Sequence, residues 1–295
     1  MCVLLFKMLA ISAGGDHSAY VLGMLKGVFA KSPELTDWTH VSGISAGALI
    51  GSQIAQIEPG DRSQFIKKIN NLKDSHVKIA KSWSAVGNIL GIVKGMLWHT
   101  SLFDSQLKHI VDERWGDKHR ELYVGAYNQT RGKYETFGPD PSADIVAASA
   151  SIPVIFQPVK YNDMEYCDGG LAHIIPIKEI KEHWDKGDLD VMICYPTDHE
   201  EYLKTCDVLS RFKLFGRVMD TVSESNWFNL NRDIEELSSM VGQDVRHGGV
   251  FKVGEKTVRV YVPNQGYYCD VVNRNFNTLK RMHRHGEEIA TKILS

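Results

Sequence analysis

The sequence predicts an α/β fold, a three-layer α/β/α sandwich with a mostly parallel central sheet. Two observations predict it: strand-like apolar runs alternate with helical runs along the chain, and residues 189–195 form an apolar run of the kind buried in a parallel sheet. The chain has 295 residues, of which 43% are hydrophobic, enough to bury roughly three quarters of the unfolded surface. Because no Pro/Ser-rich linker, repeat or low-complexity tract divides it, we expect a single domain over residues 1–295, with a motif-bearing core of about 3–200 and an elaboration over about 201–295.

The first elements are a strand, a loop and a helix. Apolar residues at 3–11 predict a buried strand, small residues at 12–16 a loop, and residues 19–29 a helix. Lys7 interrupts the apolar run and no basic residue precedes it, which argues against a membrane span or a secretory signal. Signal-peptide cleavage after Ala13 stays an alternative, although it would remove the strand that positions the loop.

A nucleophile elbow is predicted between the strand-like run at 38–42 and the apolar helical run at 48–55. Between them lies the pentapeptide Gly-Ile-Ser-Ala-Gly, in which Gly43 and Gly47 stand two residues either side of Ser45. Glycine at these positions allows neighbouring backbone to pass close to a serine held in a sharp turn. The serine hydroxyl would then lie at the positive N-terminal end of the following helix. The alternative is an ordinary glycine-serine turn, since G-x-S-x-G occurs by chance in many chains.

The later elements follow from the same periodicities. Strands are expected at residues 121–127, 133–137, 157–161, 164–167, 189–195 and 257–262, and helices at 141–151, within 205–245 and at 275–294. Asp168 therefore lies at the end of a hairpin strand, next to Gly169 and Gly170. A carboxylate in this place could accept the serine proton directly if burial raises its pKa. The alternative is an ordinary Asp-Gly turn.

Upstream, Gly14, Gly15 and Asp16 precede a helix, and small residues there leave backbone N–H groups pointing into open space, where they could receive an oxyanion. An ordinary glycine turn is the alternative. These three motifs, together with the small-residue and proline-bounded stretch at 147–159, resemble in their order the patatin-like phospholipase family. The resemblance covers residues 3 to about 175.

The resemblance implies a lipid acyl-ester hydrolase of the phospholipase A or lysophospholipase type. In it Ser45 is the nucleophile, Asp168 is the general base, and the backbone amides near Gly14, Gly15 and Asp16 form the oxyanion hole. An acyl-enzyme forms and water clears it, with no cofactor and no metal. The substrate would be a phospholipid or another acyl-ester lipid, met during transient contact with a membrane surface.

The loop departs from the family pattern Gly-Gly-Gly-x-Arg/Lys-Gly, because this chain reads Ala-Gly-Gly-Asp-His-Ser over residues 13–18. His17 stands where the family has a cation, and an unperturbed histidine is mostly neutral at pH 7. We therefore hypothesise that activity rises on mild acidification until Asp168 becomes protonated. The alternative is a histidine that only packs or hydrogen-bonds at the start of a helix.

Composition limits the other possibilities. With 34 Lys and Arg against 36 Asp and Glu, the formal charge of −2 gives no general attraction to nucleic acid. The cysteines are odd in number and have no C-x-x-C spacing, so we expect a reducing, cytoplasmic location and no structural zinc. The apolar, glycine-containing segment at 83–103 is a candidate lid or interfacial patch, giving peripheral membrane contact, with a core helix as the alternative.

Two other functions remain open. A Ser-Asp-His triad is possible because His247 follows any acid in the required chain order, but it would need His247 near Ser45. The departure in the oxyanion loop also allows a non-catalytic lipid-binding or regulatory protein on the same scaffold.

Overall fold

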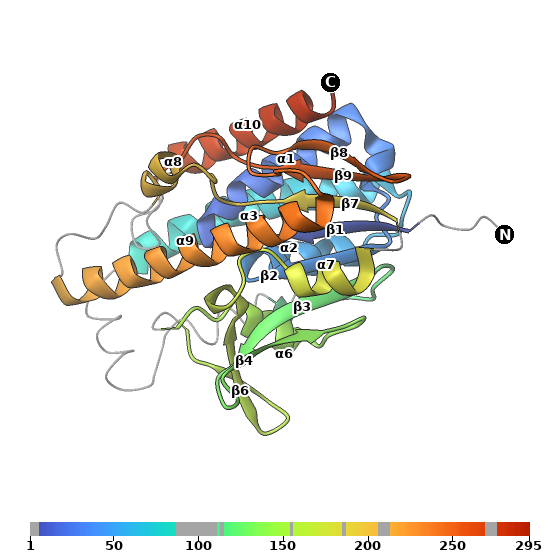
Figure 1. Ribbon diagram of the computed structural model, residues 1–295. Helices are drawn as coiled ribbons and strands as arrows, with labels where there is room; N and C mark the ends of the chain where they lie inside the picture. The colour runs from blue at the N-terminus through green and yellow to red at the C-terminus, as the bar shows by residue number, and fades with distance from the viewer. Residues whose placement is uncertain are drawn as a thin grey trace.

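The structure, a computed structural model, describes residues 6–86, 111–112, 115–153, 156–184, 187–205, 213–268 and 276–295, with the backbone alone for residues 75–86 and 213–223. One nine-stranded sheet runs through it, in the order β5-β6-β3-β2-β1-β7-β9-β8, with β4 paired to β3 (Figure 1). The strands are β1 (Lys7–Ile11), β2 (His40–Ile44), β3 (Glu121–Asn128), β4 (Lys133–Phe137), β5 (Val159–Tyr161), β6 (Met164–Asp168), β7 (Asp188–Met192), β8 (Gly249–Val253) and β9 (Lys256–Tyr261).

The central strands are parallel and the outer ones antiparallel. β3, β2, β1, β7 and β9 all run in one direction, whereas β4, β5, β6 and β8 pair antiparallel with their neighbours. This arrangement confirms the predicted α/β fold class with its parallel sheet centre. β8 was not predicted. It is an edge strand that pairs only with β9 among the described residues, and it is half-buried or exposed throughout.

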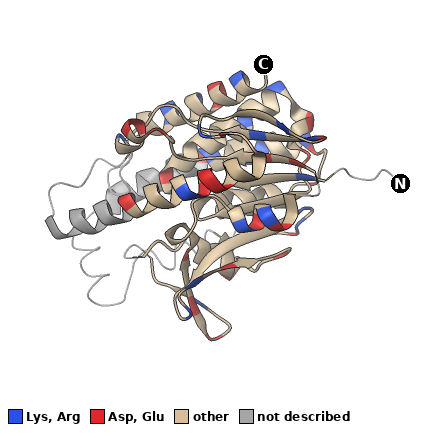
Figure 2. Cartoon of the chain, viewed as in Figure 1, with Lys and Arg blue, Asp and Glu red and all other residues tan. Residues whose placement is uncertain are grey.

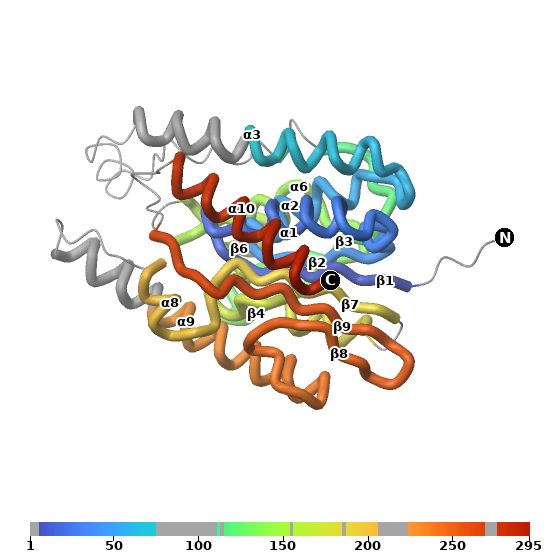
Figure 3. Tube along the Cα trace, turned by 90° about the horizontal axis from the view of Figure 1, so that it is seen from above, coloured from blue at the N-terminus to red at the C-terminus, as the bar shows by residue number. Residues whose placement is uncertain are grey.

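Helices cover both faces of the sheet, and Figure 3 shows the layers from above. The helices are α1 (Ser18–Lys31), α2 (Ala46–Ala55), α3 (Arg62–Val86), α6 (Ala143–Ser149), α7 (Ile177–His183), α8 (His199–Leu203), α9 (Lys213–Val241) and α10 (Phe276–Ile293), with short 3-10 turns η1 (Gly15–His17), η2 (Pro33–Thr36) and η3 (Gly169–Leu171). Alternate residues of β1 serve the two layers: Leu9 and Ile11 pack with α1, α2 and α10, whereas Met8 and Ala10 pack with α7 and α9.

The last helix packs backbone to backbone against the first. A Cβ atom on Gly23 would lie 2.0 Å from the carbonyl oxygen of His283, and one on Gly286 would lie 2.0 Å from that of Tyr20. Gly23 lies against His283 and Gly27, one turn later, lies against Ala290, so α10 runs parallel to α1. Lys26 and Glu287 join the pair with a 2.6 Å ion pair. Residues near the end of the chain therefore support the helix that follows the first loop.

Some of the segments and cysteines that the sequence analysis considers lie outside the residues that the structure describes. Most of the candidate lid at 83–103 lies outside the described residues, as do Cys2, Cys206 and Cys269. Cys167 and Cys194 are buried free thiols.

No helix within the described ranges is long and apolar enough to cross a membrane. Figure 2 shows basic and acidic residues mixed along the same elements.

Candidate active site

The sheet topology brings the ends of β2 and β6 together. β4 occupies one side of β3, while β2 and β6 share the other side: β2 pairs with the first five residues of β3 and β6 with its last three. Ile44 is opposite Gly125, and Asp168 is opposite the next residue, Ala126. Because β2 and β6 run in opposite directions, their carboxyl ends meet on β3. Ser45 directly follows β2 and Asp168 ends β6, so the two residues lie close together.

Ser45 lies in the turn that the pentapeptide predicts. Its φ of 57° and ψ of −125° are outside the regions that L-residues favour, so the turn is strained. The two glycines are required by close approach: a Cβ atom on Gly43 would lie 2.4 Å from the backbone of Gly47, and one on Gly47 would lie 2.4 Å from the carbonyl oxygen of Ile11. The elbow therefore depends on glycine at both positions.

The hydroxyl of Ser45 donates to Asp168. The Oγ–Oδ2 distance is 2.6 Å, and the two residues are only 4% and 5% exposed. Ser45 is the N-cap residue of α2, where a serine normally accepts a hydrogen bond from its own helix, yet its side chain makes no cap. The hydroxyl is thus directed to the carboxylate instead of the helix.

The environment of Asp168 raises the pKa of its carboxyl group to about 7. Burial is the main cause, because it disfavours the charged form; hydrogen bonds from Ser45 and from the backbone N–H of Gly170 oppose it. The Gly170 N–H lies 2.7 Å from Oδ1. Gly169 also needs to be glycine, since its Cβ atom would lie 2.4 Å from the carbonyl oxygen of Gly125. The carboxylate can therefore act as a base near neutral pH.

Ser149 is a further polar group of the site, one to which the sequence gave no role. Its fully buried hydroxyl donates to the carbonyl oxygen of Gly125 (2.7 Å) and accepts from the backbone N–H of Ser45 (2.9 Å). The hydroxyl thereby ties the elbow to β3. The small-residue stretch that contains Ser149 was recognised, but no local pattern could show that its partner lies 104 residues away.

The loop after β1 lies beside the elbow. A Cβ atom on Gly47 would lie 2.6 Å from the carbonyl oxygen of Ser12, and one on Gly14 would lie 2.2 Å from Cβ of Cys194. Gly15 has a positive φ of 49° and open space where a side chain would be. Among the described residues, the N–H groups of Gly14 and Gly15 have no acceptor. They suit an incoming oxyanion, whereas the Ser45 N–H is already bonded.

The neighbouring residues of this loop are buried. Asp16 is 6% exposed and His17 is 7% exposed. Nε2 of His17 lies 3.2 Å from the carbonyl oxygen of Tyr267, and its ring centroid is 5.0 Å from that of Tyr195. Because a carbonyl oxygen only accepts, Nε2 carries the proton in this bond. The hypothesis of a pH-dependent positive field at His17 stays a prediction, but the raised pKa of Asp168, about 7, confines any rise in activity on acidification to the range above that pH.

His247 does not lie next to Ser45. It is exposed and stands two residues before β8, which is four strands away from β2. At the usual strand spacing this separation is about 19 Å, too far for a hydrogen bond. The hydroxyl of Ser45 also reaches Asp168 with no imidazole between them. The geometry therefore contradicts a triad through His247.

We expect Gly47→Ala to lower both activity and stability strongly. The added methyl group would overlap backbone of β1, which cannot move without shifting the sheet, so a loss of about 3 kcal/mol or more in the free energy of unfolding is expected. Gly51→Ala is the matched control on the same helix, because its methyl group meets only side chains, Cγ1 of Val41 at 3.1 Å and Cδ1 of Leu122 at 3.6 Å. Urea unfolding measures the free energy of unfolding of both variants. Equal decreases in the two would show that the close approach of Gly47 to β1 does not set its requirement for glycine.

Comparisons with known proteins agree with this architecture. A family model described as patatin-like phospholipase matches residues 9–180. The probable lipid hydrolase 463L of Invertebrate iridescent virus 6 is 27% identical over 253 residues, covering 79% of this chain and 84% of the viral protein. The crystal structure of VipD from Legionella pneumophila aligns with a TM-score of 0.50 and 16% identity over 98% of this chain; the chain spans 66% of VipD. This structural likeness concerns the fold.

Proposed function

Because the chain belongs to the patatin-like phospholipase family, we propose that it hydrolyses acyl esters of lipids, as a phospholipase A or lysophospholipase does. Ser45 is the proposed nucleophile and Asp168 the proposed general base. The observation that carries the proposal is the 2.6 Å hydrogen bond between their side chains. The viral relative named as a probable lipid hydrolase supports the same class of substrate.

The reaction begins when the Asp168 carboxylate takes the hydroxyl proton of Ser45 and Oγ attacks the ester carbonyl carbon. The carbonyl oxygen becomes an oxyanion, and the backbone amides of Gly14, Gly15 and Asp16 are the proposed donors to it. The C–O bond then breaks, Asp168 returns the proton to the leaving alkoxide, and the acyl group stays on Ser45. Water, deprotonated by Asp168, attacks the acyl carbon, the bond to Oγ of Ser45 breaks, Asp168 returns the proton to Oγ, and the fatty acid is released.

A single carboxylate suffices as base because its pKa is about 7. A carboxyl group with an ordinary pKa near 3.8 would be a weak base toward a serine hydroxyl. Neither a metal nor an organic cofactor takes part in these steps. The proposal includes transient contact with a lipid surface, and the two buried free thiols support a reducing compartment such as the cytoplasm.

The proposal is tested by product analysis on lipids. Diacyl phospholipids labelled in one chain at a time, a lysophospholipid and a diacylglycerol are incubated with the protein, and released fatty acids are identified by mass spectrometry. We expect release from at least one of these lipids, and the labelled position defines the positional preference. If no lipid is cleaved while the folded protein still binds vesicles, the non-catalytic lipid-binding alternative replaces the proposal.

A further inference from the structure

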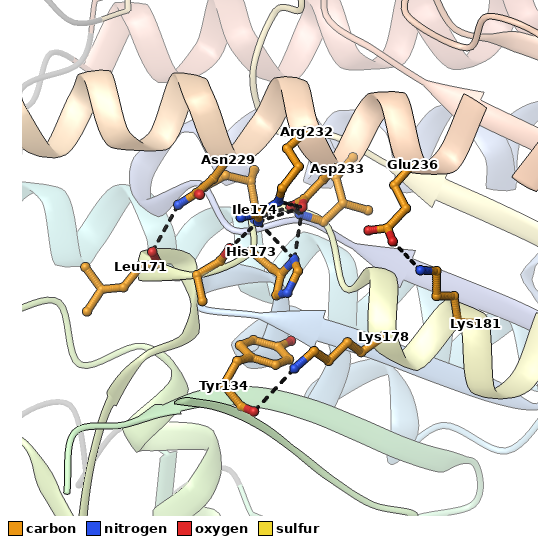
Figure 4. A network of polar contacts seen from close by, with 12 residues as sticks. Tyr134, Leu171, His173, Ile174, Lys178, Lys181, Asn229, Arg232, Asp233 and Glu236 are labelled. Atoms are coloured by element: carbon orange, nitrogen blue, oxygen red, sulfur yellow. Dashed lines mark hydrogen bonds and ion pairs between the residues drawn. The ribbon is translucent and has the colours of Figure 1, made fainter. Parts of the chain in front are cut away.

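A polar contact cluster joins α9 to the segment that follows the Asp168 motif (Figure 4). The segment is residues 171–175, and it begins where η3 ends. Asn229 donates to the carbonyl oxygen of Leu171 at 3.0 Å, and the Arg232 guanidinium donates to the carbonyl oxygen of Ala172. Asn229 and Arg232 are three residues apart, so they share a face of α9 with Asp233.

Asp233 is the centre of this cluster. Its side chain is fully buried, and Oδ2 accepts from the backbone N–H groups of Ile174 (2.7 Å) and Ile175 (3.0 Å). Oδ1 accepts from Nδ1 of His173 at 2.9 Å and from Arg232 at 2.9 Å. One carboxylate therefore fixes three consecutive residues, and a buried charge with this many donors is held in one geometry.

The fixed segment connects the two halves of the proposed site. At its start, Gly170 donates to Asp168, and a Cβ atom on Gly170 would lie 3.3 Å from that of Ala13. Further on, the carbonyl oxygen of Ile174 accepts from the backbone N–H of Ala13 at 2.8 Å, and Ala13 directly precedes Gly14. Movement of the segment would shift the base and the oxyanion loop relative to each other.

We propose that Asp233 is a positioning residue for hydrolysis, which holds residues 171–175 so that Asp168 and the Gly14-Gly15 amides surround the same carbonyl. This inference rests on the function proposed above. Asp233 does not touch the reacting atoms; it acts through the backbone that it binds. A displacement of about 1 Å in such a geometry can cost about 10²-fold in rate.

Asp233→Ala is expected to lower kcat about 10²-fold on a soluble ester, with KM little changed. The acidic limb of the pH–rate profile should also move to higher pH, because a looser Gly170 N–H stabilises the Asp168 carboxylate less. The amide oxygen of Asp233→Asn can still accept both backbone N–H groups, so kcat of this variant should be about tenfold higher than that of Asp233→Ala. A residue that only stabilised the fold would leave kcat per folded molecule and the pH limb unchanged.

Glu236→Ala is the matched control, since Glu236 lies on the same helix but pairs with Lys181 of α7. It should leave kcat and the pH limb as in the wild type; an equal loss there would mean that any loosening of α9 suffices, and would overturn the inference. If Asp233→Ala does not fold, Asp233→Glu decides, because the longer side chain displaces the carboxylate and should cost about tenfold in kcat. Wild-type kcat in that variant would overturn the inference.

The same assays separate the two proposals. Wild-type protein that hydrolyses the ester, together with an inactive Ser45→Ala variant and a fully active Asp233→Ala variant, rejects the role of Asp233 alone. Wild-type protein that neither hydrolyses the ester nor reacts with a fluorophosphonate rejects the proposed function and this inference with it.

Discussion

Replacing Ser45 by alanine will abolish lipid hydrolysis, with a fall in kcat of about 10⁴- to 10⁶-fold. Without Oγ no acyl-enzyme can form, and the remaining carboxylate has no nucleophile within the site to deprotonate except water. Fatty acid release and covalent labelling by a fluorophosphonate should disappear together. Ser52→Ala is the control: Ser52 is also a buried serine of α2, but its hydroxyl donates to the carbonyl oxygen of Leu49. Residual labelling in Ser45→Ala would point to another nucleophile.

The strain at Ser45 adds a stability signature to this experiment. At φ 57° and ψ −125°, alanine is as strained as serine, whereas glycine adopts such angles freely. Ser45→Gly should therefore be more stable than Ser45→Ala by about 1 kcal/mol or more in urea unfolding, although both are inactive. Equal stability of the two variants would show that the turn stores no strain.

Replacing Asp168 by asparagine should lower kcat about 10³-fold, because the amide cannot accept the serine proton. The wild-type rate should rise with pH through a limb near pH 7, where Asp168 ionises, and the residual rate of Asp168→Asn should lack this limb. The substitution keeps the shape of the site, since the amide can still accept from Gly170 and can donate to Ser45. A variant with wild-type kcat would mean that another group is the base.

The same variant should be more stable than the wild type at alkaline pH. The carboxyl pKa is raised in the folded state from 3.8 to about 7, so ionising the folded protein costs free energy that builds up between these pH values and is fully present above pH 7. This difference corresponds to about 4 kcal/mol at most. Asparagine carries no such cost. Urea unfolding should give a larger free energy of unfolding for Asp168→Asn than for the wild type at pH 8, and equal values near pH 4. A less stable Asp168→Asn at pH 8 would contradict the raised pKa.

How much could be predicted from the sequence depended on how local the signal is. β4 coincides with its predicted range, and Ser45 and Asp168 each belong to a motif at the end of a strand, so their places in the fold followed from short patterns. The approach of Gly43 to Gly47 was also predictable, because both lie in one pentapeptide. In these cases the partners are close in sequence or are marked by turn residues.

The features that were missed depend on distant partners. Ser149 and Asp233 are ordinary polar residues of helices until the fold places Ser45 and the segment after Asp168 beside them, 104 and 58 to 60 residues away. Asn229, Arg232 and Asp233 share one helix face, but a polar helix face usually faces solvent, so their spacing alone indicates no site. β8 was missed because it is a short edge strand whose exposed face carries both Val250 and Lys252, so apolar and polar residues do not alternate along it.

The pairing of β1 with β7, and of β7 with β9, limits how the protein can be shortened. Residues 9–180 carry every recognised motif. A fragment cut to this range would lack β7, which pairs with β1, and β9, which pairs with β7. β1 would become an open edge with unpaired amides and carbonyls, and the apolar side of α1 that α10 covers would face water. Such a fragment would self-associate in preference to folding. A recombinant protein meant for assays therefore has to retain the strands and helix that follow the motifs, although none of them takes part in the proposed chemistry.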